Sequence, residues 1–463
     1  MQVGWSALWF IVAVSLLVTV HEFGHFWVAR KLGFKVLRFS VGFGKPLFKK
    51  IGRAPDFTEY VIAAVPLGGY VRMLDERDGA IAPADLPRAF ASRPPWARIL
   101  VMLAGPAANI LFALVALWGM YWLNGVTHVK AVVDKVSTGS PAEIAGLKVG
   151  DEILSIGDTR ILDQGDATLG LLDAVSDEGV ARLEVRGGDG RNRLVTLSVP
   201  DAAQRHKLTE PERLYGGLGF QFWLPRFPAI VGNVIADGPA AKAGMLPGDL
   251  IVGADGAPIR SFNEFTDYVS ARPAQAMVLT VRRDGRDKLL NLTTTREVVE
   301  GRTIGRIRVT SPDNVSVTIP DGMRTQSDLG PLESLSYAAG KAWQMTAAQA
   351  KFFVRMITGK VSTKNISGFI SIAKYSGEAA HAGPDSFLML LVLLSLSLGF
   401  LNLLPIPILD GGQIVFQIAE WAKGGPLSDR TYMVGQQAGL LLLVLLMGVA
   451  LFNDLTGLFA AHS

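Results

Sequence analysis

Four long apolar runs constrain the fold of this chain more than any other feature of its sequence. They lie at residues 3–20, 99–123, 387–409 and 434–452, and none contains a charged side chain. A helix needs roughly 20 residues to cross a hydrocarbon core of about 30 Å, so each run is long enough to span a bilayer. Buried helices of soluble domains seldom extend so far without a charge. The runs therefore predict a polytopic α-helical membrane protein with four transmembrane helices.

The sequence that follows the first run indicates how the chain is oriented. The run continues directly into an H-E-F-G-H segment at residues 21–25, without the small-residue cleavage site of a signal peptide, so we expect it to be retained. Eight basic residues and no acidic ones follow between residues 30 and 53. By the positive-inside rule, this pattern places residues 31–97 in the cytoplasm and residues 125–385 outside.

The composition excludes several classes of function. The chain has no cysteine, so it forms no disulfide and performs no thiolate chemistry. Its net charge is only +4 and its basic residues are local, which indicates the lipid bilayer as a partner rather than nucleic acid. No G-x-x-x-x-G-K-[ST] run is present, so we expect no step driven by ATP.

The long outer segment contains an internal repeat. Three groups of residues in one copy recur in the other at the same spacing: Ser140-Pro141-Ala142, Ala145-Gly146-Leu147 and Gly150-Asp151 match Gly238-Pro239-Ala240, Ala243-Gly244-Met245 and Gly248-Asp249. Each copy predicts a short helix closed by glycine, a Gly-Asp turn and then a strand.

These copies, at residues 126–222 and 223–312, resemble PDZ domains of the circularly permuted bacterial kind. The stretch Gly217, Leu218, Gly219 and Phe220 is similar to a PDZ carboxylate-binding loop, in which backbone N–H groups hold the end of a peptide. The alternative is a pair of β-rich spacers whose grooves are blocked.

Two further segments have a readable pattern. Residues 61–71 form a β-prone run with two glycines, which is either a hairpin that re-enters the membrane or an ordinary cytoplasmic hairpin. Residues 328–385 have the pattern of amphipathic helix, with Trp343, Phe352 and Ile357 among polar residues, and we expect them to lie on the outer membrane surface.

The strongest chemical signal is the segment at residues 21–25. His21 and His25 lie one turn apart on one face of a helix, so both imidazoles can reach the same ion. Zinc lowers the pKa of a bound water to about 7, and Glu22 between the histidines can accept its proton. Ionisable residues at a helix centre cost roughly 2.5–3.5 kcal/mol on insertion scales, so three of them beside an apolar run indicate a bound cation.

A hydrolytic zinc site needs a third protein ligand. No other histidine lies near the inner end of an apolar run, whereas Asp410 follows the third run. Pro405 and Pro407 break the helix before it, and the glycines after it allow a tight bend. Alone, Asp410 could equally be an interfacial capping residue; opposite the histidine pair, it is the predicted third ligand.

These motifs together resemble the site-2 proteases, the intramembrane zinc metalloproteases, over essentially the whole chain. His21, Glu22 and His25 match the HExxH motif of that family, and the segment from Asn402 to Gly411 matches its NxxPxPxxDG motif. Gly105, Pro106 and Asn109 match its GPxxN motif, and residues near Gly68 match its re-entrant β region. Before the third run, Phe369 stands where relatives usually have proline, which puts the local bend in doubt.

The resemblance implies a division into transmembrane helices and other segments. Transmembrane helices are expected at 1–30, 98–124, 386–411 and 434–456, a cytoplasmic or re-entrant β region at 31–97, PDZ-like domains at 126–222 and 223–312, and an amphipathic connecting region at 313–385.

The resemblance also implies a role for each matching residue. His21, His25 and Asp410 would hold Zn²⁺, and Glu22 would act first as general base and then as general acid. Asn402 would hold the substrate backbone or steady the oxyanion, with Asn109 a weaker candidate for the same work. The sheet edge at Gly68, Gly69, Tyr70 and Val71 would bind an unwound substrate segment as an added strand.

The implied setting is regulated intramembrane proteolysis. The substrate would be a single-pass membrane protein, such as an anti-sigma factor already clipped outside the membrane, or a leftover signal peptide. The enzyme would be a multi-pass protein of the inner membrane with its PDZ-like domains on the periplasmic side. Two other functions fit parts of the sequence: a membrane-anchored metalloprotease that cuts cytosolic chains, and a PDZ-bearing scaffold with an inactive site.

Overall fold

The fold is described from a computed structural model of the chain. It describes residues 2–76, 79, 81–210, 213–225, 227–299, 302–312 and 319–462. The start of the predicted connecting region, residues 313–318, therefore lies outside the described residues. The chain divides into two compact units: Met1–Thr127, Ala203–Pro211 and Gln326–Asp454 form the first, and His128–Ala202, Glu212–Thr325 and Leu455–Ser463 form the second.

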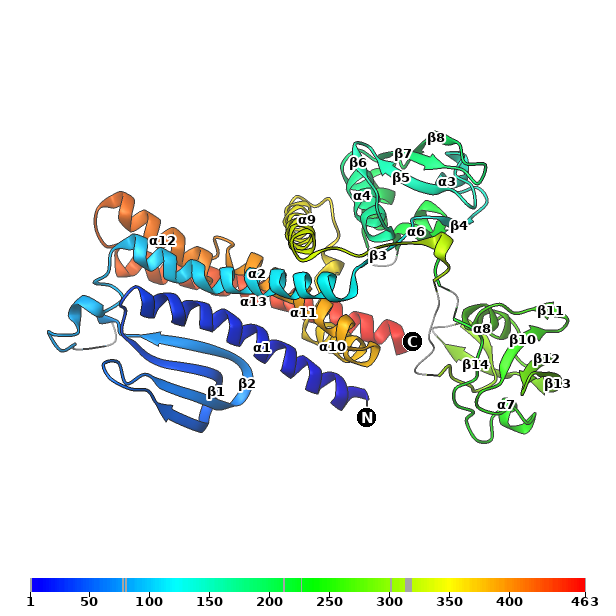
Figure 1. Cartoon of the computed structure of the whole chain (residues 1–463), viewed down its shortest axis with the longest axis horizontal. Helices are drawn as coiled ribbons and strands as arrows, with labels where there is room; N and C mark the ends of the chain where they lie inside the picture. The colour runs from blue at the N-terminus through cyan, green and yellow to red at the C-terminus, as the bar shows by residue number, and fades with distance from the viewer. Residues whose placement is uncertain are drawn as a thin grey trace. The chain divides into compact units, whose positions relative to one another are not determined.

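The first unit is built mainly from long helices (Figure 1). They are α1 (Gln2–Lys31), α2 (Pro95–Asn124), α9 (Pro331–Ile357), α10 (Phe369–Ala382), α11 (Pro384–Asn402), α12 (Asp410–Lys423) and α13 (Asp429–His462), with a short α5 (Ala202–Leu208). Within the described residues, four helical segments are long and apolar enough to cross a membrane: Gly4–Lys31, Pro95–Asn124, Pro384–Asn402 and Asp429–Thr456. Each of the four predicted spans therefore contains a helix with the length and apolarity that crossing a membrane requires.

The third span ends earlier than the sequence predicts. Helix α11 stops at Asn402, and Asp410 begins the separate helix α12 instead of ending the span at residue 411. The prolines explain the break, because Pro405 and Pro407 cannot donate a backbone hydrogen bond and their rings clash with the preceding turn. The break leaves the first turn of α12 free to carry Asp410 toward α1.

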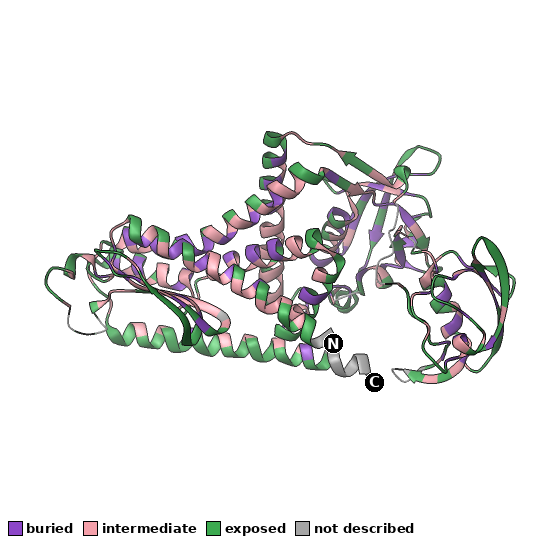
Figure 2. Cartoon of the chain, turned by 60° about the horizontal axis from the view of Figure 1, so that its bottom comes forward, coloured by how far each residue is buried: buried purple, intermediate pink, exposed green. Residues whose placement is uncertain are grey.

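Helices α1 and α2 cross in very close contact. Buried positions of α1 recur every fourth residue and so form one face: Ala13, Leu17, His21, His25 and Ala29. Figure 2 colours buried residues purple, and they appear as separate patches along the helices. A Cβ atom on Gly24 would overlap the carbonyl oxygen of Ala104 in α2. The crossing therefore requires glycine at position 24, and it brings α2 against the histidine face of α1.

The region between α1 and α2 forms a small antiparallel sheet from two bent strands, β1 (Val36–Ile51) and β2 (Glu59–Met73). Phe39 in β1 pairs with both Val71 and Tyr60, while Phe48 pairs with Ile62. The sheet therefore has four segments, with residues 69–73 along one edge and residues 46–51 along the other. In Figure 1 this sheet lies beside α1.

Helix α10 begins at Phe369 although the family pattern has proline near this point. Proline is favoured at the first helical position because it needs no backbone donor there. Here Asp454 of α13 supplies acceptors instead: its carboxylate accepts the backbone N–H groups of Gly368 at 3.0 Å and Ile370 at 2.9 Å, and the hydroxyl of Ser371 at 2.6 Å. The bend persists without proline because α13 caps the helix.

The second unit contains the two sequence repeats, and both have the same sheet order. In the first repeat the order is β6-β5-β7-β8, and in the second it is β11-β10-β12-β13. The first repeat comprises β4 (Val133–Val136), α3 (Pro141–Ile144), β5 (Glu152–Ile156), β6 (Thr159–Arg160), α4 (Gln164–Asp177), β7 (Val180–Arg186), β8 (Asn192–Ser198), α6 (Arg213–Leu218) and β9 (Phe220–Phe222). Strand β9 pairs with β4.

The second repeat has the matching elements. It comprises α7 (Pro239–Lys242), β10 (Leu250–Ala254), β11 (Ala257–Pro258), α8 (Phe262–Ser270), β12 (Ala276–Arg283), β13 (Arg286–Thr293), β14 (Thr295–Val299) and β15 (Arg302–Arg306). Two further strands, β3 (Val126–Val129) and β16 (Arg324–Ser327), pair with each other. The predicted sequence of helix, glycine, Gly-Asp turn and strand is confirmed in both copies.

Candidate active site

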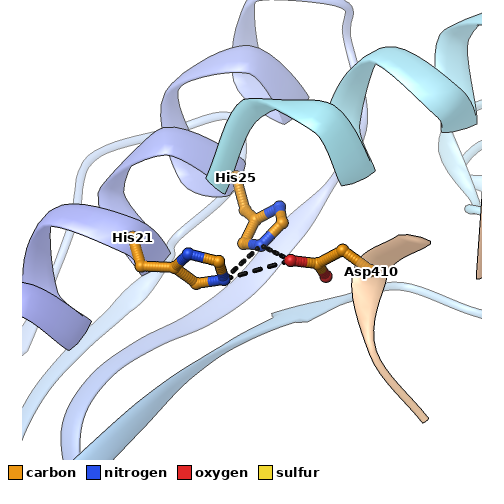
Figure 3. A group of neighbouring side chains, drawn as sticks. All are labelled: His21, His25 and Asp410. Carbon is orange, nitrogen blue, oxygen red and sulfur yellow. Dashed lines mark hydrogen bonds and ion pairs between the residues drawn. The ribbon is translucent and has the colours of Figure 1, made fainter. Parts of the chain in front are cut away.

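Three side chains from two distant parts of the chain converge on one point (Figure 3). His21 and His25 project from the buried face of α1, and Asp410 reaches them from the first turn of α12. Nε2 of His21 lies 3.2 Å from Nε2 of His25 and 3.1 Å from Oδ2 of Asp410, and the third edge, from His25 to Asp410, is 3.4 Å. Both histidines are buried.

This triangle has the dimensions of a zinc site. Zinc binds histidine nitrogen and carboxylate oxygen at about 2.0–2.2 Å in a tetrahedron, which separates neighbouring ligand atoms by roughly 3.3 Å. The three ligand atoms lie within 4.8 Å of one another. Their separations of 3.1, 3.2 and 3.4 Å lie on both sides of the separation expected in a zinc tetrahedron. Oδ2 of Asp410 is buried and accepts no hydrogen bond from any described residue, so its lone pairs are open to an ion.

Helix α2 forms a further wall of the site. A Cβ atom on Gly105 would overlap the imidazole of His25, so only glycine admits the two rings here. Nδ1 of His25 lies 2.7 Å from the carbonyl oxygen of Val101, and Nδ2 of Asn109 lies 3.2 Å from Nδ1 of His21. Val101, Gly105 and Asn109 are one turn apart, so a single face of α2 holds both rings.

A buried ion pair fixes α12 against α2. Nη1 of Arg98 donates to Oε2 of Glu420 at 2.9 Å, and both side chains are almost fully buried. Glu420 also accepts the hydroxyl of Tyr432 at 3.0 Å. Charges paired in this way inside a protein are expensive to separate, so α12 is held firmly near its C-terminal end, away from Asp410.

Glu22 faces the edge of the β sheet. A Cβ atom on Gly69 would lie 3.3 Å from Cγ of Glu22, and the backbone of Val71 is near enough to act on the carboxyl group of the same side chain. Tyr70 stacks on Phe43 with ring centroids 6.1 Å apart. The structure therefore brings Gly69 and Val71, two of the four residues predicted to bind substrate, beside Glu22.

The other predicted residues are placed less directly. Asn402 is the last residue of α11, at the start of the segment that leads to Asp410. Asn109 contacts His21 rather than standing free for a substrate. Gly217 and Leu218 lie in α6, Gly219 follows it and Phe220 begins β9. The N–H of Gly219 donates to Tyr215 at 2.8 Å, so this donor is engaged within the chain.

Two contacts in and around the site have no signal in the sequence. The Val101 carbonyl that holds His25 is a backbone group, so any residue at position 101 could supply it. Arg98 and Glu420 are far apart in sequence, and neither belongs to a recognised motif.

Comparison with known proteins agrees with this geometry. The family model described as Peptidase family M50 matches residues 9–446. The chain is 37% identical over 456 residues to the regulator of sigma-E protease RseP of Escherichia coli K12, which covers 98% of this chain and 99% of the relative. It is 38% identical over 463 residues to protease RseP of Yersinia pestis, covering 99% and 100% of the two chains.

A third relative adds the metal. A putative zinc metalloprotease of Neisseria meningitidis serogroup A is 37% identical over 466 residues, covering 98% of this chain and 99% of the relative. The family model matches nearly the whole sequence, and the relatives match it from end to end. These matches identify the family from the sequence itself. The chain belongs to Peptidase family M50, the site-2 proteases, and is a zinc-dependent metalloprotease with several membrane-spanning helices.

Proposed function

We propose that this protein is an intramembrane endopeptidase that cleaves the transmembrane segment of a single-pass membrane protein. The observation that carries the proposal is the closure of the His21, His25 and Asp410 triangle between α1 and α12. The histidines belong to a helix long enough to span the bilayer. A membrane-anchored protease for cytosolic chains would need its ligands in a soluble domain, and an inactive scaffold would have no reason to keep the triangle intact.

The protein's own residues divide the chemistry among them. His21, His25 and Asp410 hold the zinc ion, which when bound polarises a carbonyl and lowers the pKa of water to about 7. Glu22 takes the proton of the attacking water and then delivers it to the leaving amine. Asn402 at the end of α11 is the proposed partner for the substrate backbone or the oxyanion.

The edge of the β sheet offers a way to present the substrate. The amides of a helix in lipid are held in internal hydrogen bonds, so the helix must unwind before it can be cut. Residues 69–73 form a sheet edge beside Glu22, where an unwound segment can add as a further strand. Gly68, Gly69, Tyr70 and Val71 are the proposed substrate-binding residues.

Contacts along α1 support a sheet that re-enters the membrane. Near one end, Arg30 donates to the hydroxyl of Tyr60 at 3.3 Å; near the other, the hydroxyl of Ser15 donates to the carbonyl of Pro66 at 2.6 Å. At 1.5 Å per residue, the sheet follows α1 for about 22 Å, well into a spanning helix. Phe48 and Ile62 of the sheet are more than half exposed, as lipid contact requires.

The biological setting follows from the relatives' names and from charge. Relatives named as regulators of sigma-E protease favour a role in the sigma-E pathway, with an anti-sigma factor as the membrane substrate. The basic residues between positions 30 and 53 favour a sheet that enters the membrane from the cytoplasmic side, and repeats on the periplasmic side of the inner membrane. The repeats are the proposed PDZ-like filter that excludes substrates with bulky outer domains.

The proposal is tested on the full-length protein in lipid nanodiscs with a single-pass membrane peptide. Glu22→Gln removes the proton carrier but no ligand, so cleavage should fall roughly a hundredfold or more while zinc stays bound. Asp410→Ala removes a ligand and should lose both zinc and cleavage. Substantial cleavage by the Gln variant, or one tightly held zinc in the Ala variant, would contradict the assigned roles.

The topology can be tested separately because the chain has no cysteine of its own. A single cysteine at position 45 should resist a membrane-impermeant thiol reagent in intact cells, whereas one at position 284, in the turn between β12 and β13, should react. Labelling at position 45 would overturn the proposed orientation.

A further inference from the structure

Asn109 is a buried amide with one end unsatisfied. It is completely buried on the face of α2 that contacts the two imidazoles, one turn beyond Gly105. Its Nδ2 lies 3.2 Å from Nδ1 of His21, while its Oδ1 has no hydrogen-bond partner among the described residues. A buried acceptor left unpaired costs about 1–3 kcal/mol, so Oδ1 gains nothing in this orientation.

His25 shows which tautomer a metal site requires. Its Nδ1 lies 2.7 Å from the carbonyl oxygen of Val101, which can only accept, so Nδ1 carries the proton and Nε2 presents a lone pair. His21 presents its Nε2 to the same point, so it also needs its proton on Nδ1 when the ion is bound. An Nδ1–H needs an acceptor, and the amide nitrogen of Asn109 cannot accept.

A half-turn of the Asn109 amide supplies the acceptor that Nδ1–H of His21 needs. The oxygen and nitrogen of an amide have nearly the same shape, so the turn exchanges them without new clashes. Oδ1 then gains a donor, and Nδ1–H of His21 gains an acceptor at the same separation. We propose that Asn109 is a positioning residue, which accepts the Nδ1–H bond of His21 and holds its Nε2 toward the zinc ion. This inference rests on the zinc site proposed above.

The surroundings of Asn109 suit that task better than substrate binding. The hydroxyl of Ser395 in α11 donates to the backbone carbonyl of Asn109 at 2.9 Å, and both residues are completely buried. The side chain lies on the far side of His21 from the point where the three ligand atoms meet, because it contacts Nδ1 and not Nε2. We therefore prefer this positioning role to the role in substrate or oxyanion binding that the sequence suggested.

The test measures zinc affinity by chelator competition in the purified full-length protein. Asn109→Leu keeps the size of the side chain and removes the acceptor, so zinc should bind 10–100-fold more weakly. Asn109→Asp keeps an acceptor for Nδ1–H and should stay within about threefold of the unchanged protein. Asn124→Leu, at the exposed end of the same helix, is the matched control and should have no effect.

The outcomes separate the alternatives. Unchanged zinc affinity in Asn109→Leu overturns the proposal, and a fall in cleavage without a fall in affinity would return Asn109 to substrate binding. Equal losses in Leu and Asp would show that the position serves packing only, which also overturns it. If the Leu variant does not accumulate, Asn109→Ser, which is too short to reach His21, replaces it with the same expected loss. Failure of the unchanged protein to hold zinc would overturn the zinc site itself.

Discussion

The two repeats of the second unit share a scaffold that one pair of charged residues secures. In the first, Arg193 donates to both carboxylate oxygens of Asp151; in the second, Arg283 donates to both oxygens of Asp249, each at 2.7 Å. Each aspartate also accepts the backbone N–H three residues before it, at 2.7 Å and 2.9 Å. The Gly-Asp turn that reveals the repeat in the sequence is therefore the anchor of an ion pair.

The repeats differ at the contact between the short helix, α3 or α7, and the residue next to the last strand, β9 or β15. The first has Gly219 with a φ of 79° against the side chain of Ser140, which caps α3. The second has Arg308 with a φ of 62° against Gly238, which caps α7. Corresponding hydrogen bonds reach Gly219 at 2.8 Å and Arg308 at 3.1 Å, so the positions are equivalent. In the first repeat the capping residue of the short helix carries the side chain and the facing residue is glycine; in the second repeat the capping residue is glycine and the facing residue carries the side chain.

A second difference concerns the helix that faces this strand. In the first repeat, Tyr215 stacks edge-on against Phe220 and Phe222 of β9 and hydrogen-bonds Thr168 of α4. In the second, a Cβ atom on Gly305 of β15 would overlap the carbonyl oxygen of Val269 at the end of α8. The shared residues thus specify the scaffold, while the surface between helix and strand is built differently in each copy. Peptide binding at Gly217–Phe220 stays a prediction.

Removing the shared anchor should have the largest effect. Asp249→Ala leaves both Arg283 and the N–H of Leu246 without their acceptor, so the second repeat should lose more stability than it loses through any other change proposed below. Hydrogen exchange of the full-length protein should show faster exchange in β10 and β12. The first repeat should be unaffected, and Asp151→Ala should give the converse pattern. Slow exchange in both variants would show that the ion pair is not what secures the scaffold.

The contact at Gly219 should rank next. Gly219→Ala puts a side chain into a left-handed conformation and against Ser140, so the first repeat should lose about 2–4 kcal/mol. Ser140→Gly in the same chain should recover the part that comes from the clash. Exchange rates in β4 and β9 provide the measurement, and a Gly219→Ala protein that exchanges like the unchanged one would refute the equivalence with Arg308.

Much of the molecule could be predicted because its signals are local. The four spans follow from length and apolarity, and His21 and His25 share a face because of helix geometry. Asp410 could be inferred because few other ligands stood near an inner end. The Gly-Asp turns fixed the repeat, although the sequence did not reveal that each aspartate would pair with an arginine.

Contacts between distant segments could not be predicted. Asn109 reads as a helix-packing or substrate residue until the crossing at Gly24 shows that it meets His21. Phe369 suggested a lost bend because nothing in the sequence links it to Asp454, which caps α10 from α13. The early end of α11 at Asn402 was hidden because residues 403–409 are as apolar as the span itself.

Acid should weaken the ion pair between Asp249 and Arg283 in the second repeat. Burial tends to raise the pKa of Asp249, but the hydrogen bonds from Arg283 and from the N–H of Leu246 outweigh it and leave the pKa below its ordinary value. The stability that this group contributes is therefore complete above about pH 4 and is lost as the pH falls through the lowered pKa. Hydrogen exchange of the second repeat, corrected for the intrinsic pH dependence of exchange, should show a loss of protection below pH 4, by less than Asp249→Ala causes at neutral pH because protonation is partial. Asp249→Asn should remove this part of the pH dependence; an identical profile would assign it to other groups.

Giving the second repeat the contact of the first, by changing Arg308 to glycine and Gly238 to serine, should have the smallest effect. Arg308→Gly relieves a left-handed conformation that costs about 1–2 kcal/mol, but the glycine gains freedom in the unfolded chain, so the second repeat should gain only about 0.5–1 kcal/mol. Gly238→Ser alone brings a Cβ atom to 2.9 Å from Cβ of Arg308 and should be neutral or destabilising. Combined with Arg308→Gly, the serine can cap α7 as Ser140 caps α3, and should then add a few tenths of a kcal/mol.

The sign of the Gly238→Ser effect should therefore depend on residue 308, and hydrogen exchange of the second repeat in the full-length protein measures that dependence. A serine whose effect is the same in both backgrounds would show that the two positions are not coupled, and that the repeats diverged at this contact for separate reasons.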